Sequence, residues 1–158
     1  MRRLLCALLA LLLLFGGGRA EEEGLLWLHG EFETVETDGY RLQNGFYEYE
    51  KIAHRGDISL YAVGYEAESG YALLTPEEAG GDLTYERMED IDLGAAHARR
   101  WRYTDAGSQW DFLAVEAEGF FFSIMIAVPE TGAERLDAEV EALIASLSLE
   151  AEPTDDTP

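Results

Sequence analysis

Residues 110–149 decide the fold, and they read WDFLAVEAEGFFFSIMIAVPETGAERLDAEVEALIASLSL. Two runs in this stretch, 110–117 and 120–128, are rich in aromatic and branched residues, which favour strands. Glu118 and Gly119 between them are typical of a tight hairpin connection. The second run is apolar on both of its faces, and this pattern predicts a central strand that is covered on both sides.

The segment after the hairpin has the pattern of an amphipathic helix. From residue 133 to residue 149, apolar side chains recur at steps of three and four, and most acidic side chains fall outside that set. Thr131 and Glu134 have the spacing of a capping box at its start. A helix with one buried stripe is therefore predicted over residues 133–149.

Strand patterns continue upstream of the hairpin. Residues 96–104 alternate as a third strand, and residues 105–108 have the composition of a turn. Residues 58–66 predict a further strand, with Gly64 as a bulge.

The remaining upstream elements are weaker. An opening hairpin is predicted from residues 25–35 and 40–42, with its turn at 37–39. Residues 75–78 have the spacing of a second capping box. Residues 83–93 suggest at most a short helix over 85–89. Together the elements predict an α+β fold: a single-layer antiparallel sheet of about five or six strands, with the C-terminal helix packed on one face.

The ends of the chain differ from its middle. Residues 1–20 combine an arginine pair, a 12-residue apolar run and a small-residue cleavage site, as in a secretory signal peptide. The alternative is an uncleaved anchor, but twelve helical residues span about 18 Å against about 30 Å of hydrocarbon. Residues 150–158 are predicted to be a disordered acidic tail. A single domain is predicted between them, over residues 21–149.

The charge of the chain limits its partners. It has 32 acidic and 11 basic side chains, and without residues 1–20 the count is 32 against 8, a net charge of −24. Nucleic acids and anionic lipids require lysine or arginine, so neither is an expected partner. The single cysteine, Cys6, lies within residues 1–20, so the exported domain would be free of disulfides. The sequence predicts a secreted or periplasmic protein without a stable membrane span after cleavage.

The order of elements in residues 95–149 resembles the PsbP-like or Mog1-like group of secreted α/β proteins. The resemblance consists of the strand AHARRWRY, the hairpin WDFLAVEAEG with its aromatic second strand, and a helix that closes on Ser146 and Leu147. It implies a binding or accessory protein of the bacterial envelope with no chemistry of its own. Lipoprotein members carry a lipidation cysteine that this chain lacks. No functional residue carries over.

Motifs of common enzyme classes are absent from the sequence. No cysteine follows residue 20, and the chain has no phosphate-binding glycine loop, nucleophile elbow or His-Glu zinc motif. We therefore predict no catalytic residues, no metal site, no cofactor, and a non-enzymatic module that binds a protein or small ligand. The alternative is a small secreted hydrolase or glycan-acting enzyme with paired carboxylates. Its groove would be lined by Trp27, Trp101 and Trp110, which otherwise belong to the core.

Two acidic patterns offer oxygen ligands. His29, Glu31 and Glu33 would share one face of a strand, which suits either a weak metal site or a solvated face. Residues 89–92 contain three carboxylates, but they lack the spacing of a calcium loop. Neither pattern predicts a specific metal site.

Basic side chains concentrate in the strand at residues 96–104. Arg100 and Arg102 share one face of it, and Arg99 and Trp101 share the other. One interpretation is that the arginines pair with neighbouring acids, such as Glu116 and Glu118. The sharper interpretation is a ligand-binding patch of Arg100, Trp101 and Arg102, because arginine forks bind carboxylates bidentately.

Overall fold

The computed structural model of the protein describes residues 25–71, 74–79 and 82–151. The predicted signal peptide lies outside these residues. The predicted acidic tail does so as well, except for its first two residues, Glu150 and Ala151, which belong to a strand. No helix in the described ranges combines the length and the apolar character needed to cross a membrane.

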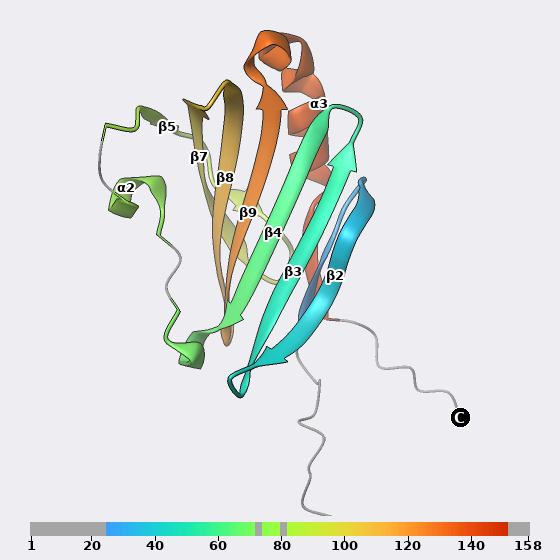
Figure 1. The fold of residues 1–158 in the computed structure, drawn as a ribbon, viewed down its shortest axis with the longest axis vertical. Helices are drawn as coiled ribbons and strands as arrows, with labels where there is room; N and C mark the ends of the chain where they lie inside the picture. Colours follow the sequence, from blue (N-terminus) through green and yellow to red (C-terminus); the bar gives the residue numbers. More distant parts are fainter. Residues whose placement is uncertain (1–24, 72–73, 80–81, 152–158) are drawn as a thin grey trace, which may run out of the picture. The chain divides into compact units, whose positions relative to one another are not determined.

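The large sheet has eight antiparallel strands rather than the predicted five or six (Figure 1). Their order is β2-β3-β4-β9-β8-β7-β5, with β6 also pairing with β7. The strands are Glu33–Gln43 (β2), Phe46–Arg55 (β3), Ile58–Glu66 (β4), Tyr85–Arg87 (β5), Ile91–Asp92 (β6), His97–Asp105 (β7), Ser108–Ala117 (β8) and Phe120–Pro129 (β9). The predicted α+β class is confirmed.

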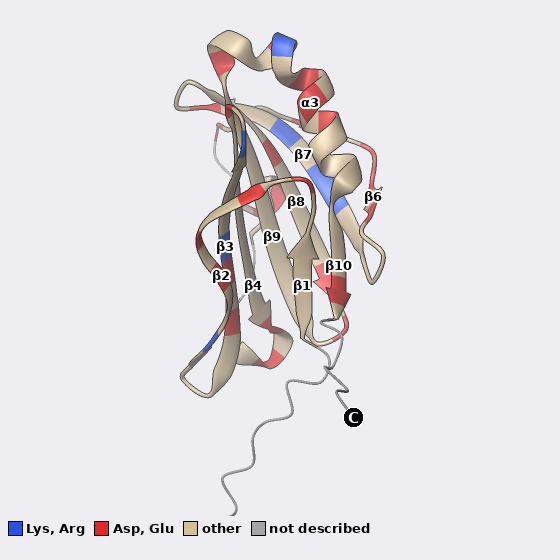
Figure 2. Cartoon of the chain, turned by 90° about the vertical axis from the view of Figure 1, so that its right-hand side faces the viewer, with Lys and Arg blue, Asp and Glu red and all other residues tan. Residues whose placement is uncertain are grey.

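A second, two-stranded sheet pairs β1 (Leu26–His29) with β10 (Ser148–Ala151). Figure 2 shows this sheet and helix α3 (Ala133–Ser146) over the same face of the large sheet, which we call the α3 face. The opposite surface, which carries Tyr61, Phe112, Phe121 and Met125, is called the outer face. The short helical segments are Ala67–Ser69 (η1), Pro76–Ala79 (α2) and Glu130–Gly132 (η2).

The main core lies between the sheet and α3. Strand β9 sits between β4 and β8, as predicted for a central strand. Its residues on the α3 face are all buried, and α3 supplies the other half of this core through its apolar stripe. The stripe consists of Ala133, Leu136, Val140, Leu143 and Ile144. On the outer face, Phe121 and Met125 of β9 remain half-buried, so the predicted cover on both sides is complete on one side only.

The C-terminal half agrees with the sequence pattern. Strands β7, β8 and β9 start and end within two residues of their predicted bounds, and β4 has the predicted bounds. The turn between β7 and β8 places Ala106 and Gly107 at φ values of 50° and 76°.

The first hairpin turns elsewhere than predicted. Asn44 and Gly45 form its turn at φ values of 54° and 87°, between β2 and β3. The predicted turn at residues 37–39 instead lies inside β2, where the register shifts twice. Thr37 and Gly39 have positive φ there. Bulges and turns both contain residues with positive φ, so composition alone did not distinguish a bulge from a turn.

Helix boundaries depend on contacts that local patterns do not reveal. Helix α3 begins at Ala133 as predicted, but it ends at Ser146 because the chain turns extended into β10. The capping box predicted at Thr131 is absent, since this residue lies in η2 and the N-cap is Gly132 without a side-chain bond.

The segment between β4 and β7 yields one confirmed prediction and one wrong one. The capping box at Thr75 is present: its N–H donates to Glu78 Oε2 at 3.0 Å, and the Glu78 N–H donates to Thr75 Oγ1 at 3.3 Å. The short helix over residues 85–89 is wrong. The chain forms β5 and β6 there because its backbone pairs with β7.

The only lysine, Lys51, is buried in β3. Its Nζ donates to the Leu28 carbonyl oxygen at 2.7 Å and lies 3.0 Å from Asp38 Oδ1. The ammonium also lies 4.9 Å from the centre of the Phe32 ring. Lys51 therefore connects β1 to the large sheet.

Gly64 makes room for an aromatic ring, and the predicted bulge at this position is wrong. The residue pairs in unbroken register with Tyr49 on one side and Phe122 on the other. A Cβ atom at Gly64 would lie 2.5 Å from two atoms of the Phe122 ring. Glycine is required here by close packing.

Replacing Gly64 with alanine is expected to lower the free energy of unfolding by about 1 to 3 kcal/mol, the usual cost of overpacking. Urea unfolding measures this loss. In the double variant Gly64→Ala/Phe122→Leu, the smaller side chain at position 122 should relieve part of the clash. The loss of unfolding free energy in the double variant should therefore be smaller than the sum of the two single losses. Simple additivity would contradict the proposed contact.

Candidate functional site

The three residues of the predicted patch lie on two faces of β7. Arg100 and Arg102 point to the α3 face, whereas Trp101 points to the outer face opposite Phe112. Arg100 is 5% exposed and Trp101 is completely buried. The three side chains therefore share no surface, and their ligand-binding role stays a prediction.

Arg100 is held by two carboxylates on the α3 face. Its Nε donates to Asp111 Oδ1 at 2.7 Å. Its two terminal nitrogens bind both oxygens of Glu141 on α3, at 2.8 and 2.6 Å. This bidentate fork connects sheet and helix, and Figure 2 shows the basic positions of β7 beside acidic positions of α3.

Arg102 extends the same network. It binds Asp111 at 3.1 Å, Asp137 at 3.3 Å and Glu141 at 3.2 Å. The pairing interpretation is thus confirmed: Arg100 and Arg102 pair with Asp111, Asp137 and Glu141, and Arg99 pairs with Glu116, which was named from the sequence. The predicted partner Glu116 lies on the outer face, where it pairs with Arg99 at 3.5 Å.

The network predicts a loss of stability in acid. Hydrogen bonds from Arg100 lower the pKa of Glu141 below its usual range. Because the folded-state pKa is the lower one, this contribution is present above the unfolded pKa of about 4.3 and is lost as the pH falls through the folded value. The unfolding free energy of the Glu141→Gln variant should therefore fall less between pH 7 and pH 3 than that of the wild type, as measured by urea titrations. An identical pH profile would contradict this role of Glu141.

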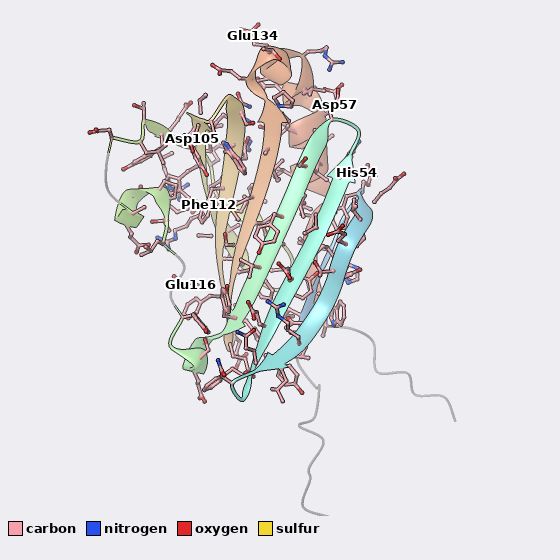
Figure 3. All side chains as sticks on the ribbon, viewed as in Figure 1. His54, Asp57, Asp105, Phe112, Glu116 and Glu134 are labelled. Atoms are coloured by element: carbon pink, nitrogen blue, oxygen red, sulfur yellow. The ribbon has the colours of Figure 1, made fainter. Side chains whose placement is uncertain are left out.

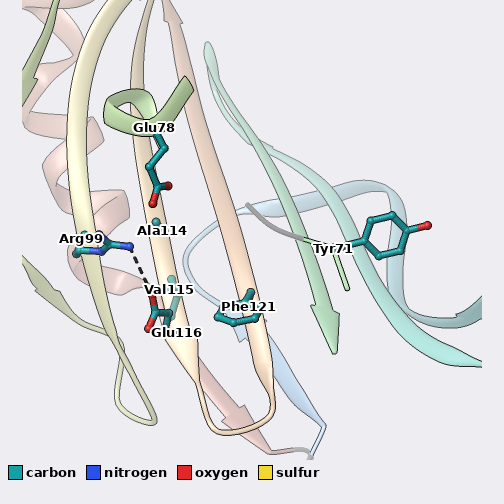
Figure 4. A pocket seen from close by; sticks show the side chains of 7 residues that line it. All are labelled: Tyr71, Glu78, Arg99, Ala114, Val115, Glu116 and Phe121. Atoms are coloured by element: carbon teal, nitrogen blue, oxygen red, sulfur yellow. Dashed lines mark hydrogen bonds and ion pairs between the residues drawn. The ribbon is translucent and has the colours of Figure 1, made fainter. Parts of the chain in front are cut away.

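A cavity of about 140 Å³ opens on the outer face beside Arg99 (Figure 4). Its lining comes from β7, β8, β9, α2 and the segment after β4: Tyr71, Glu78, Arg99, Ala114, Val115, Glu116 and Phe121. In Figure 4 the Glu78 carboxylate points toward the region where Arg99 meets Glu116, and the Tyr71 ring points away. Figure 3 labels Phe112 and Glu116, which lie four residues apart along β8.

Trp101 supports this cavity from the side. The guanidinium groups of Arg87 and Arg99 lie 4.9 and 5.5 Å from the centre of its ring, within cation–π range. Its indole N–H donates to Glu77 Oε1 of α2 at 3.1 Å. The buried ring therefore fixes α2 and the stem of Arg99, which are two walls of the cavity.

The cavity carries more negative than positive charge. Glu78 and Glu116 face the single cation Arg99. Hydrogen bonds from the backbone and side chain of Thr75 lower the pKa of Glu78, so this carboxylate is ionised at neutral pH. The site is thus suited to an additional cation.

Half-exposed aromatic side chains border the cavity on the outer face. The rings of Tyr65 and Tyr71 lie 4.8 Å apart, and Phe121 is directly opposite Tyr65 in the β4–β9 register. The Tyr61 hydroxyl donates to Glu50 Oε1 at 3.0 Å. Burial and this hydrogen bond raise the pKa of Tyr61 to about 12, so it remains protonated.

The other residues considered from the sequence do not converge. Glu31 pairs with Arg55 at 3.2 Å, and Glu33 lies 4.0 Å from His54; these four side chains line an open groove of about 580 Å³. His29 is not among the residues that line it. The part of the chain that is described contains no cluster of three metal-ligating side chains.

Two of the three carboxylates in residues 89–92 and the remaining tryptophans have local partners. Asp90 pairs with Arg87, and Asp92 Oδ1 accepts a hydrogen bond from Gly94 N–H at 2.8 Å. Trp27 packs edge-on against Tyr49, and Trp110 stacks on Tyr103.

Comparison with known proteins adds a likeness of the fold. No family model and no curated protein matches the chain. It is similar to a cyanobacterial PsbP. The solution structure of this protein, CyanoP from Synechocystis sp. PCC 6803, matches with a TM-score of 0.40 and 14% identity, over 85% of this chain and 99% of that chain. The predicted resemblance to the PsbP-like group is confirmed to that extent, and it transfers no residue role.

The sequence pattern singled out Arg99, Glu116 and Glu78 for other reasons and did not predict the cavity. Strand alternation placed Arg99 on the face opposite Arg100, and the capping box included Glu78. Their meeting depends on the β7–β8–β9 register and on the path of α2 across the sheet, which no local pattern specifies.

Proposed function

We propose that the protein is a non-enzymatic binding or accessory module of the bacterial envelope or extracellular space, and that it binds through the outer face. The observation that carries this proposal is the asymmetry of the sheet. Helix α3 and the β1–β10 pair cover one face, whereas the other presents half-exposed aromatic side chains around a small cavity. Exposed apolar surface rimmed by polar groups is typical of interaction sites.

The shape and charge of the site favour binding over catalysis. Pockets for small-molecule ligands usually enclose about 300 to 1,000 Å³, about twice this cavity or more. Glycoside hydrolysis needs one carboxylic acid with a raised pKa, whereas the pKa of Glu78 is lowered. Asp111 is the one buried acid in the described ranges, and two arginines occupy its oxygens.

Export of the module is proposed from residues 1–20 alone. Their arginine pair, apolar run and small-residue site are the features that secretion machinery recognises. The absence of cysteine from the rest of the chain is compatible with an oxidising compartment, where the core alone would hold the domain.

Photo-crosslinking from single positions tests the proposed face. A photoreactive phenylalanine analogue replaces Tyr61 or Met125 on the outer face, and Ala138 on the exposed side of α3 provides the control. In cells of the native host, both outer positions should give the same adduct, and position 138 should not.

Two results would count against this function. Absence of an adduct from both outer positions, or the same adduct from position 138, would contradict binding through the outer face. Hydrolysis of a glycan that is lost in both Glu78→Gln and Glu116→Gln would favour the alternative, a small secreted hydrolase.

A further inference from the structure

We infer that the outer-face cavity receives the side chain of a lysine or arginine from an exposed basic segment of a partner protein. The inference rests on the proposed function and specifies the chemistry of the partner. The cavity, its two carboxylates and the neighbouring aromatic rings carry the argument.

The size of the cavity suits one side chain. Its volume is about 140 Å³. A protein cavity of about 150 Å³ accepts a single benzene molecule, so a group of that size fills it. A partner that inserts one residue and lays the rest of its surface on the sheet matches this geometry better than a free metabolite does.

The charges in the cavity select a cation. Glu78 comes from α2 and Glu116 from β8, and Arg99 lies between them. Arg99 pairs with Glu116 at 3.5 Å. The Glu78 carboxylate bonds to Thr75 and has no ion pair among the described residues. One negative charge is therefore left over, at a site that a single ammonium or guanidinium group can reach.

The walls of the cavity suit the stem and charge of such a residue. The half-exposed ring of Phe121 lines one side, and a cation over an aromatic face is stabilised by the ring electrons. The methylene stem of lysine or arginine can pack along apolar surface while its charged end meets the carboxylates. Phe121 and Glu116 together thus provide both contacts that a long basic side chain makes.

The charge of the whole chain disfavours anionic occupants of this face. With 32 acidic against 11 basic side chains, two copies of the protein repel each other, and anionic lipids or nucleic acids are repelled as well. A basic protein segment is instead attracted over a long range, and its association is accelerated at low ionic strength.

Titration of the ¹⁵N-labelled protein with blocked tetralysine peptide tests the inference. The backbone amide signals of Arg99, Glu116 and Phe121 should shift in proportion to binding, and blocked tetraglutamate should leave them unchanged. The Glu78→Gln/Glu116→Gln variant should raise the Kd for tetralysine about tenfold, as expected for two lost ion pairs.

A control variant with the same change in net charge separates the site from general attraction. Glu134→Gln/Glu139→Gln alters two exposed acids of α3 and should change the Kd less than about twofold. Glutamine at position 78 can still complete the capping box, so α2 should stay in place. Equal weakening in both double variants would overturn the inference, as would shifts that map to another surface.

The results also distinguish this inference from the proposed function. If the outer-face adduct forms but the Kd for tetralysine is the same in the wild type and in the Glu78→Gln/Glu116→Gln variant, the basic-segment inference fails and the binding function stands. If free spermine binds as tightly with the same shifts, assignment to a protein segment fails. If no adduct forms at the outer face, the proposed function itself fails.

Discussion

Replacing Asp111 with alanine is expected to lower the free energy of unfolding by about 3 to 5 kcal/mol, the usual cost of removing one partner from a buried ion pair. Asp111 is 2% exposed and accepts hydrogen bonds from both Arg100 and Arg102. Its removal leaves the buried Arg100 with the half-exposed Glu141 as its remaining carboxylate. Urea unfolding followed by circular dichroism measures the loss.

An exposed ion pair provides the comparison. Asp57 lies 3.3 Å from Arg135, and both side chains are about 70% exposed. The variant Asp57→Ala should cost less than about 1 kcal/mol, because water screens the pair. A similarly small loss in Asp111→Ala would show that this buried ion pair does not stabilise the fold.

Replacing Trp101 with alanine is the second large effect, an expected loss of about 3 to 5 kcal/mol from the cavity left in the core. The ring is completely buried, and its loss also removes the hydrogen bond to Glu77 and the support of two arginines. Thermal and urea unfolding of the variant measure the effect.

Trp110 is the matched control for Trp101. It is half-buried and stacks on Tyr103 with 6.3 Å between the ring centres. Its replacement by alanine should cost about 1 kcal/mol, since one aromatic pair is lost without a closed cavity. Unchanged stability of Trp101→Ala would instead favour the predicted role of this residue as a ligand contact.

The sequence predicted the C-terminal half well because its patterns are local. Strand alternation and the Glu118-Gly119 connection define β8 and β9, and the spacing of apolar residues defines most of α3. Strand β3 received no prediction, since Glu48, Glu50 and Lys51 give it a charge content that is unusual in strands. Lys51 is tolerated because β1, 23 residues away in the chain, supplies the Leu28 carbonyl oxygen that accepts its hydrogen bond.

The candidate site was predictable only in part, because some of its contacts come from residues far away in the chain. Alternation along β7 correctly divided Arg100 and Arg102 from Arg99 and Trp101. Arg100 and Arg102 are held by Asp111 on the neighbouring strand β8 and by Asp137 and Glu141 on α3. The two α3 carboxylates lie 35 to 41 residues away, and only the packed fold brings them there. Local composition pointed to Glu116 and Glu118, on or beside the neighbouring strand, and of these Glu116 pairs with Arg99.

The enclosed Lys51 gives the molecule an unusual response to amine-directed reagents. Acylating dyes need a neutral, accessible amine, and the single lysine is buried with its ammonium against Leu28 and Asp38. The folded protein therefore offers such a dye the α-amino group alone, and one label per chain is obtained without mutagenesis. A second label, counted by mass spectrometry, would mark molecules in which β1 has detached from β3. The rate at which Lys51 is labelled would then measure the rate of that opening.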